Sequence, residues 1–340
     1  MPHDTSPLEL GAAPLTLDDY LDVARAGRAV RLAAPARARM DAFRASLRRQ
    51  LDGGRRIYGV NTGYGADSVT TIAPAASRTA QRNTLRSHAA GTGAPVPAPL
   101  VRGMMLLKAG VLAQGYSAVR PVVAELLLAM LNAGITPLVP EQGSLAASGD
   151  LIPCGHLGLA MLGEGEVFYH GERGPAERAL RAAGLEPLAP EEKEGLALVN
   201  GTAFSAAYAL DNVAATRELI AVADIGAAAS LQALKGFPSA YDPRVVATRP
   251  FPGALAVAAN MRALTADSPL LHGTRGRVHD PYCLRCVPQV HGASRDAFRY
   301  VEGAVLLELN AFTDNPLIFP EEDEVVSGGN FHAQPIGLPM

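Results

Sequence analysis

The sequence has little of three features that would define a class of protein. It has only three cysteines in 340 residues, too few for a disulfide framework, so a reducing cytoplasm is the expected location. Its longest run without a charged side chain is 16 residues, whereas a membrane-spanning helix needs about 20 apolar residues. The net charge is only −3, which excludes a strongly basic nucleic-acid-binding protein. The beginning of the chain lacks the basic and apolar segments of a secretory signal. From the apolar runs and the net charge, neither a membrane nor a nucleic acid is an expected partner.

Hydrophobic residues, in contrast, make up 48% of the chain, enough for the core of one large domain or two. Ten of the 27 arginines fall between Arg25 and Arg56, where they alternate with Ala and Leu at helical spacing. Asp41 and Asp52 lie in the same stretch. A solvated helix face is therefore favoured over a nucleic-acid site.

Three segments have the hydrophobic pattern of helices, namely residues 16–51, 100–133 and 202–234. The third is apolar on nearly every face, and such a helix must be buried among other helices, which predicts a helical bundle. Between these segments, residues 57–70 are predicted to form a Gly-rich loop and residues 137–143 an irregular stretch. Residues 164–195 are predicted to form a short hairpin followed by a charged linker.

Residues 141–153, EQGSLAASGDLIP, are mostly small and join two apolar stretches. One interpretation is a flexible linker in which Ser148 or Asp150 caps the next helix. The other is chemical, because a tight turn at Ala147-Ser148-Gly149 can bring the glycine nitrogen onto the alanine carbonyl carbon when no Cβ stands in the way. Ring closure and loss of the serine hydroxyl would release two waters and leave an electrophilic methylene. From these residues alone both interpretations remain open.

Six motifs occur in the order in which one enzyme family carries them. They are YGVNTGYG at 58–65, GSLAASGDL at 143–151, NGT at 200–202, DPYCLRCVPQ at 280–289, TDNPL at 313–317 and SGGNFH at 327–332. Through them the chain resembles the aromatic amino acid ammonia-lyase and aminomutase family, which includes histidine, phenylalanine and tyrosine enzymes. The resemblance implies a mainly α fold of the aspartase and ammonia-lyase type.

The resemblance also implies how the chain is organised. Residues 1–199 would form an N-terminal mixed domain, in which Ala147-Ser148-Gly149 becomes a methylidene-imidazolone (MIO) without external cofactor or metal. Residues 200–340 would begin a long helical bundle that is incomplete at its C-terminus, since family members continue well beyond this point. A fragment, half of a split enzyme, and a shortened member completed by a second chain remain open. Family sites take residues from several subunits, so a homotetramer is expected.

Eliminating ammonia from an α-amino acid requires a better leaving group than a free amine and removal of a weakly acidic β-proton. The MIO methylene would capture the amine. By resemblance, Tyr58 would take the β-proton, and Arg285 would bind the substrate carboxylate with its planar fork. Asn200, Tyr282 and Asn330 would hydrogen-bond the carboxylate or the imidazolone oxygen.

Three further residues are expected at the substrate. Phe331 would pack near the ring, and Gly65 belongs to the tyrosine motif. The pair Ser87-His88 stands where phenylalanine enzymes of the family carry Phe-Leu, and His88 favours a ring that can hydrogen-bond. L-Histidine to urocanate is therefore the first choice and tyrosine the second. A phenylalanine lyase, a 2,3-aminomutase and a non-catalytic subunit that needs a partner chain remain open.

Several observations qualify these assignments. A core histidine bonded to a carbonyl is the alternative for His88, and His279 stands where most relatives carry Gln. Cys283 and Cys286 form a CxxC pair, which can be redox-active or half of a zinc site. The sequence has no second such pair, and Cys154 is distant, so buried thiols in a helical core are expected instead.

Overall fold

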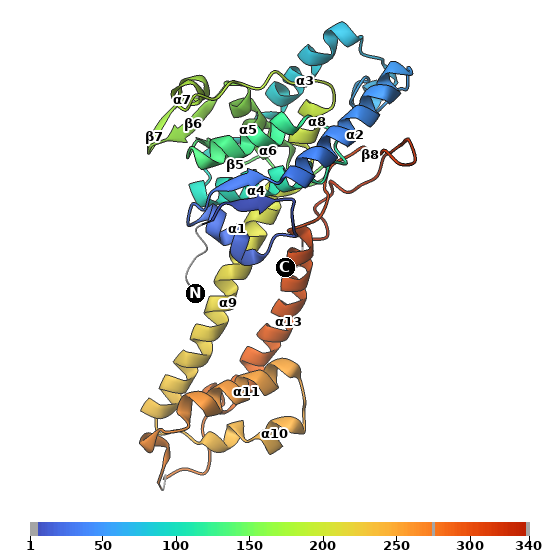
Figure 1. The fold of residues 1–340 in the computed structure, drawn as a ribbon. Helices are drawn as coiled ribbons and strands as arrows, with labels where there is room; N and C mark the ends of the chain where they lie inside the picture. Colours follow the sequence, from blue (N-terminus) through green and yellow to red (C-terminus); the bar gives the residue numbers. More distant parts are fainter. Residues whose placement is uncertain (1–5, 274–275, 338–340) are drawn as a thin grey trace. The chain divides into compact units, whose positions relative to one another are not determined.

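The structure is a computed structural model that describes residues 6–273 and 276–337. Its contacts divide the chain into two compact units (Figure 1). The first comprises Met1–Asp211 and Leu306–Met340, and the second comprises Asn212–Val305.

Helices form most of the first unit. They are α1 (Leu17–Ala24), α2 (Ala34–Asp52), α3 (Pro74–His88), α4 (Ala98–Ala113), α5 (Pro121–Asn132), α6 (Leu151–Met161), α7 (Ala176–Ala182), α8 (Glu194–Val199), the 3-10 turn η1 (Gly65–Val69) and the first part of α9 (Ala203–Ala233). The start of α1 is fixed by Thr16 and Asp19, each of whose side chains accepts a bond from the other's backbone N–H. Proline lies in the first turn of α2, α3, α4 and α5, where a missing N–H leaves no bond unmade.

The strands of this unit are short and form small sheets. They are β1 (Leu8–Leu10), β2 (Val30–Leu32), β3 (Thr92–Pro95), β4 (Thr136–Pro137), β5 (Pro140–Gln142), β6 (Glu166–Tyr169), β7 (Glu172–Pro175), β8 (Leu317–Phe319) and β9 (Glu324–Val326). β1 pairs with β2 in parallel, whereas β3 with β5, β8 with β9, and the three strands β4-β6-β7 are antiparallel. These strands lie in the connections between helices and do not form a separate sheet layer.

The core of the first unit lies around α4, which is buried along most of its length and packs on α1 and α5. Tyr20 of α1 is completely buried where α4 carries Gly103, and a Cβ at Gly103 would lie 2.3 Å from the Tyr20 hydroxyl oxygen. That hydroxyl donates to the carbonyl of Ala207 at 3.0 Å, which ties α1 to α9.

Three further helices position the candidate site. α3 packs on α6 and α8, and α6 packs on α8. Gly155 of α6 permits this approach, because a Cβ there would lie 2.7 Å from the carbonyl carbon of His88. His88 ends α3, Gly149 shortly precedes α6, and Asn200 follows α8. The packing of these helices therefore fixes three segments that the sequence singles out.

The second unit is a helical assembly with its own core. Its elements are the rest of α9, η2 (Pro238–Tyr241), α10 (Pro243–Ala247), α11 (Pro252–Thr265), η3 (Pro269–Leu271), α12 (Tyr282–Arg285) and most of α13 (Val287–Glu308). Buried residues such as Leu231, Tyr241 and Met261 pack together. Asp224 accepts bonds from Asn260, His291 and Arg295. No helix among the described residues of either unit is long and apolar enough to cross a membrane.

The predicted mainly helical fold is confirmed, including the long helix α9. Other expectations were incomplete. The helix predicted over 100–133 is two helices, because Gly115 adopts a φ of +92° and Pro121 starts α5. The stretch 137–143 contains part of β4 and the whole of β5, and α7 lies in the predicted linker. The boundary between residues 199 and 200 stays a prediction.

The second half of α9 is not buried on every face within this single chain, and its burial against partner helices stays a prediction. Leu219, Val222 and Ile225 are more than half exposed within this single chain, and they recur along one side of the helix. The reason is that the second unit supplies too few helices to cover α9 all round.

Candidate active site

The Ala147-Ser148-Gly149 segment lies in a bent, closely packed turn. Ala146 has a φ of +57° and Gly149 a φ of +76°. Gly149 forms a parallel bridge with Gly201, and a Cβ at Gly149 would lie 2.3 Å from the Gly201 carbonyl oxygen. Only glycine fits this position, for reasons of both backbone conformation and space. Ala147 is exposed and Ser148 half-buried.

Asp150 anchors this turn from within the protein. Its completely buried carboxylate accepts hydrogen bonds from the Ser144 hydroxyl at 2.7 Å and from the backbone and hydroxyl of Ser205 at 2.8 and 2.7 Å. Its own N–H donates to Gly201 at 2.7 Å. Asp150 is at the N-cap position of α6 but makes no side-chain cap bond there. The interpretation in which Ser148 or Asp150 caps the next helix with its side chain was therefore wrong.

The tyrosine loop brings Tyr58 and Gly65 together. The Tyr58 hydroxyl accepts a bond from the Gly65 N–H at 3.3 Å, and its side chain remains 37% exposed. The ring of Tyr64 lies edge-on to that of Tyr58, with centroids 6.2 Å apart. Tyr64 shares a 3.0 Å hydrogen bond with Thr84 of α3, and burial raises the pKa of Tyr64. The more accessible phenol is thus Tyr58, and its half-buried neighbour Tyr64 holds the loop against α3.

Asn200 is held by the TDNP segment. Its Nδ2 donates to the carboxylate of Asp314 and to the carbonyl of Asn315, both at 3.0 Å. Both partners are acceptors, which settles the orientation of the amide and leaves Oδ1 for other contacts. The predicted bond from Asn200 to an oxygen of substrate or imidazolone would need one of these two hydrogens.

A buried lysine completes this cluster. Lys193 is fully buried, and its Nζ contacts Asp314 at 2.7 Å and the Asn315 carbonyl at 2.8 Å. Ser117 donates to the same carboxylate at 2.6 Å. Burial lowers the pKa of Lys193, and the adjacent Asp314 opposes that shift. The sequence singles out Asp314 as part of TDNPL but gives it no role, and nothing in the sequence pointed to Lys193.

The segment that contains Asn330 and Phe331 reaches the same turn. Ala333 donates to the carbonyl of Ala146 at 3.1 Å, and Gly328 donates to the side chain of Asn315 at 2.7 Å. Asn330 is exposed and Phe331 half-buried. The first unit therefore brings together the tripeptide turn, the Asn200 cluster and residues 327–333.

His88 is half-buried at the end of α3. Its Nδ1 lies 2.8 Å from the carbonyl oxygen of Thr84, so this nitrogen carries the proton that is donated. In the neutral imidazole, Nε2 is then an acceptor. The carbonyl bond is the one expected of a structural histidine, and it also orients the ring, so the predicted contact with substrate stays a prediction.

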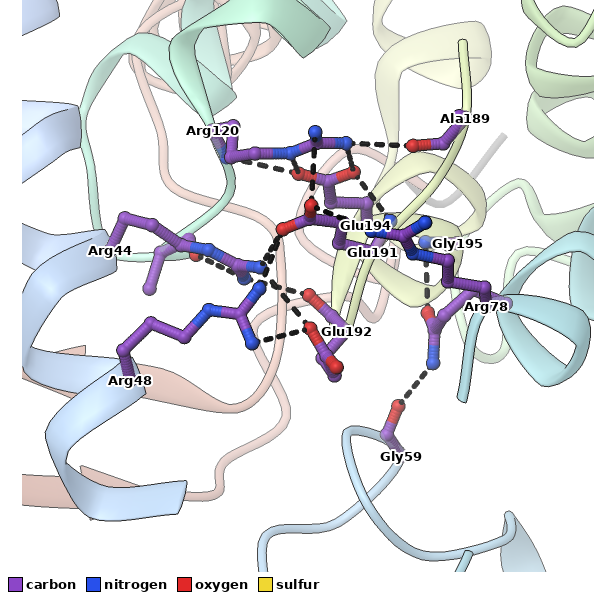
Figure 2. A network of polar contacts seen from close by, with 12 residues as sticks. Arg44, Arg48, Gly59, Arg78, Arg120, Ala189, Glu191, Glu192, Glu194 and Gly195 are labelled. Carbon is purple, nitrogen blue, oxygen red and sulfur yellow. Dashed lines mark hydrogen bonds and ion pairs between the residues drawn. The ribbon is translucent and has the colours of Figure 1, made fainter. Parts of the chain in front are cut away.

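A network of arginines and glutamates holds the N-terminal side of α8 (Figure 2). Glu194 is completely buried and accepts two bonds of 2.7 Å from the guanidinium of Arg120. Glu191 accepts bonds from Arg44 at 2.9 Å and Arg48 at 2.6 Å. Burial acts to raise the pKa of Glu191, but the surrounding arginines outweigh it and the pKa falls below its ordinary value. The network fixes the helix that leads to Asn200.

Tyr282 and Arg285 belong to the second unit, whose position relative to the first is not determined. The Arg285 guanidinium lies 4.8 Å from the centroid of the Tyr282 ring, and its Nε is buried without a hydrogen-bond partner among the described residues. It lines a pocket of about 440 Å³ with His279 and Gln289, among others. The structure therefore does not place Tyr282 or Arg285 with respect to Ser148.

The cysteines differ from one another in their surroundings. Cys154 is buried as expected, and burial raises its pKa to about 11. Cys283, however, is exposed and Cys286 only half-buried, so the expectation of buried thiols was wrong for this pair. The reason is that the short helix α12 buries only Leu284. No group of three or more His, Cys, Asp or Glu side chains suited to a metal occurs among residues 6–273 and 276–337.

Comparison with known proteins identifies the family. The family model described as aromatic amino acid lyase matches residues 15–340. The chain belongs to this family. Enzymes of the family are ammonia-lyases and aminomutases that use MIO. The chain is 45% identical to a histidine ammonia-lyase of Anaeromyxobacter sp. (strain K), over 98% of the chain and 68% of that protein.

Solved structures of the aromatic amino acid lyase family agree with the fold. A tyrosine aminomutase from Streptomyces globisporus matches with a TM-score of 0.90 at 34% identity, over 97% of the chain and 66% of its own. A histidine ammonia-lyase from Trypanosoma cruzi matches with a TM-score of 0.87 at 36% identity, over 97% and 62%. The chain thus spans about two thirds of the length of the relatives it matches.

Proposed function

We propose that the chain is an MIO-dependent aromatic L-amino acid ammonia-lyase that converts L-histidine to urocanate and ammonia. The observation that carries this proposal is the 45% identity to histidine ammonia-lyases across 98% of the chain. His88, which offers a polar side chain to a polar ring, supports the choice of substrate.

The residues present fit formation of MIO from Ala147-Ser148-Gly149. The turn is already bent at Gly149, which has no Cβ and whose φ of +76° suits glycine. Asp150 and Gly201 hold the segment on its C-terminal side. When formed, the imidazolone supplies an electrophilic methylene that makes the substrate amine a competent leaving group.

The chain's own residues have the remaining tasks. Tyr58 takes the β-proton while the carbon–nitrogen bond breaks, and Gly65 holds its phenol oxygen in place. Arg285 binds the substrate carboxylate, a role that fits its place in a pocket and its Nε, which has no hydrogen-bond partner in the part of the chain that the structure describes. Asn200 offers its amide oxygen, an acceptor suited to the substrate ammonium.

The test is product analysis of the purified chain with L-histidine, L-tyrosine and L-phenylalanine. We expect urocanate and ammonia from histidine as the main products. The variant Tyr58→Phe should keep KM but lose kcat by about 10²-fold or more, because it removes only the proton acceptor. Unchanged kcat would mean that another group takes the β-proton.

A second candidate has its own support, since the tyrosine aminomutase from Streptomyces globisporus matches with a TM-score of 0.90. A 2,3-aminomutase would return ammonia to the β-carbon, so a β-amino acid in the product mixture identifies it. A tyrosine or phenylalanine ammonia-lyase would instead release coumarate or cinnamate.

A candidate of another class is an incomplete or non-catalytic subunit, which is motivated by coverage of about two thirds of the relatives. The same assays with and without a second chain that carries the remaining helices distinguish it. Activity that appears only in the mixture would support it, and activity of the chain alone would exclude it.

A further inference from the structure

Gln81 lies between two backbone segments that carry proposed site residues. It is on α3 and only 1% exposed. Its Oε1 accepts from the N–H groups of Gly195 and Leu196 at 2.9 and 3.3 Å, and its Nε2 donates to the carbonyl of Gly59 at 3.4 Å. Figure 2 shows Gly59 and Gly195 at the two ends of this connection. The amide orientation is fixed, because Oε1 meets two N–H donors and Nε2 meets a carbonyl acceptor. The Gln81 side chain also interacts with the Tyr64 hydroxyl and acts to lower the pKa of that phenol.

The first contact caps α8 from outside. Gly195 and Leu196 are in its first turn, where backbone N–H groups have no partner within the helix. Lys193, at the N-cap position, makes no side-chain cap bond. Gln81 therefore supplies the acceptor that the local sequence lacks, at a distance of 114 residues along the chain.

The second contact holds the tyrosine loop one residue beyond Tyr58. Gly59 has a φ of +65°, and a Cβ there would lie 2.6 Å from Leu196 and 2.7 Å from Tyr64. The loop thus rests directly on α8. Thr84, one turn further along α3, bonds to Tyr64 and strengthens the same junction.

We infer that Gln81 is a positioning residue that couples the Tyr58 loop to the helix leading to Asn200, and so sets where the phenol lies relative to the site. This inference rests on the proposed function. Gln81 contacts neither the tripeptide turn nor any side chain to which a chemical role is assigned. Its effect passes through backbone contacts at Gly59 and at the start of α8, and through its interaction with the Tyr64 side chain of the same loop.

Two variants separate the two contacts. Gln81→Met removes both, whereas Gln81→Glu keeps an acceptor for α8 and loses the donor to Gly59. A carboxylate near a helix N-terminus is favourable, so Gln81→Glu should retain α8. Asn83→Asp makes the same amide-to-carboxylate change at an exposed position of α3 and is the matched control.

The first readout is amide hydrogen exchange of the chain. In Gln81→Glu, exchange within residues 57–65 should rise about tenfold or more while α8 remains as in the wild type. In Gln81→Met both segments should exchange faster, and Asn83→Asp should change neither. The inference would be overturned if Gln81→Glu keeps its helical content and residues 57–65 still exchange at the wild-type rate. That outcome would decide the matter even if Gln81→Met does not fold.

The second readout is catalysis. Both Gln81 variants should lose kcat about tenfold or more with KM within about threefold, because substrate contacts stay while the phenol is displaced. A rise in KM with kcat unchanged would contradict the proposal that Gln81 positions Tyr58. If the wild-type chain releases no ammonia, the proposed function fails, and the exchange experiment alone decides whether Gln81 couples the two segments.

Discussion

Ser148 is the side chain on which the proposed chemistry depends most directly. Its hydroxyl is the group lost when the methylene forms, and alanine has no such group. We expect Ser148→Ala to fold normally, to show no loss of two waters by intact-protein mass spectrometry, and to have no lyase activity. The wild-type chain should show that loss. Turnover at the wild-type level in Ser148→Ala would refute MIO chemistry.

His88 decides the substrate in the same proposal. A site built around a polar ring leaves a polar atom unpaired when phenylalanine binds, which costs about 1–3 kcal/mol. His88→Phe should therefore raise the ratio of kcat/KM for phenylalanine over histidine by about 5- to 150-fold. His88→Gln, which stays polar, is the control and should move the ratio much less. A ratio unchanged within a few-fold would make His88 a purely structural residue, bonded to Thr84.

For single residues, the sequence predicts the members of a continuous motif better than it predicts contacts between residues that lie far apart in the chain. Ser148 and Gly149 could be named because they stand within one recognisable tripeptide. The pairing of Lys193 with Asp314 could not be predicted, because 121 residues separate the two and Lys193 belongs to no recognisable motif. The role of Gln81 was missed for the same reason, since its hydrogen-bond partners are mainly distant backbone atoms, which leave no trace in side-chain patterns.

Among the elements, α4 offers two glycines with opposite surroundings. A Cβ at Gly103 would strike the Tyr20 ring, whereas one at Gly110 would make ordinary 3.9 Å contacts with Leu10 and Leu15. Gly103→Ala should lower the urea midpoint, as overpacking costs about 1–3 kcal/mol. Gly110→Ala should raise it, because alanine favours a helix by about 0.5–1 kcal/mol. Equal urea midpoints for the two variants would show that the Tyr20 ring can move to accommodate a Cβ at Gly103.

The network that holds α8 predicts a dependence on pH. The pKa of Glu191 in the folded protein lies below its ordinary 4.5, so its stabilising effect is present above pH 4.5 and is lost as pH falls through the folded pKa. Glu191→Gln should therefore lower the melting temperature at pH 7, and the difference from wild type should shrink in acid. Glu177→Gln, an exposed carboxyl paired with Arg181, is the control. A difference that grows in acid would contradict this assignment.

Hydrophobic pattern, more than length, decided which helices were predictable, since the 22-residue α13 was not predicted. α9 was found almost to the residue, because a run of about thirty apolar and small residues has few alternatives. Strands of two to four residues, such as β4 and β5, are too short to show alternation. The loop that divides α4 from α5 depends on Gly115, whose left-handed conformation cannot be distinguished in sequence from a tolerated helical glycine.

At the scale of the whole molecule, the exposed apolar side of α9 calls for partners. Leu219, Val222 and Ile225 form a stripe of the kind that monomeric proteins rarely expose. We expect the chain to form a homo-oligomer, with a tetramer as the predicted state, in light scattering. Replacing Val222 and Ile225 with Lys should dissociate it, whereas Glu172→Lys on the first unit should not. A stable and active wild-type monomer would refute the prediction.

The contact between Gly149 and Gly201 also gives the proposed maturation an order in time. As the chain leaves the ribosome, the tripeptide emerges some fifty residues before Gly201 and Ser205, on which its bent shape depends. Cyclisation must therefore wait until α8 and the start of α9 have been made and have docked. A chain that stalls or misfolds earlier keeps an ordinary serine at position 148. A modified residue at position 148 would therefore be found only in chains that had folded as far as the start of α9.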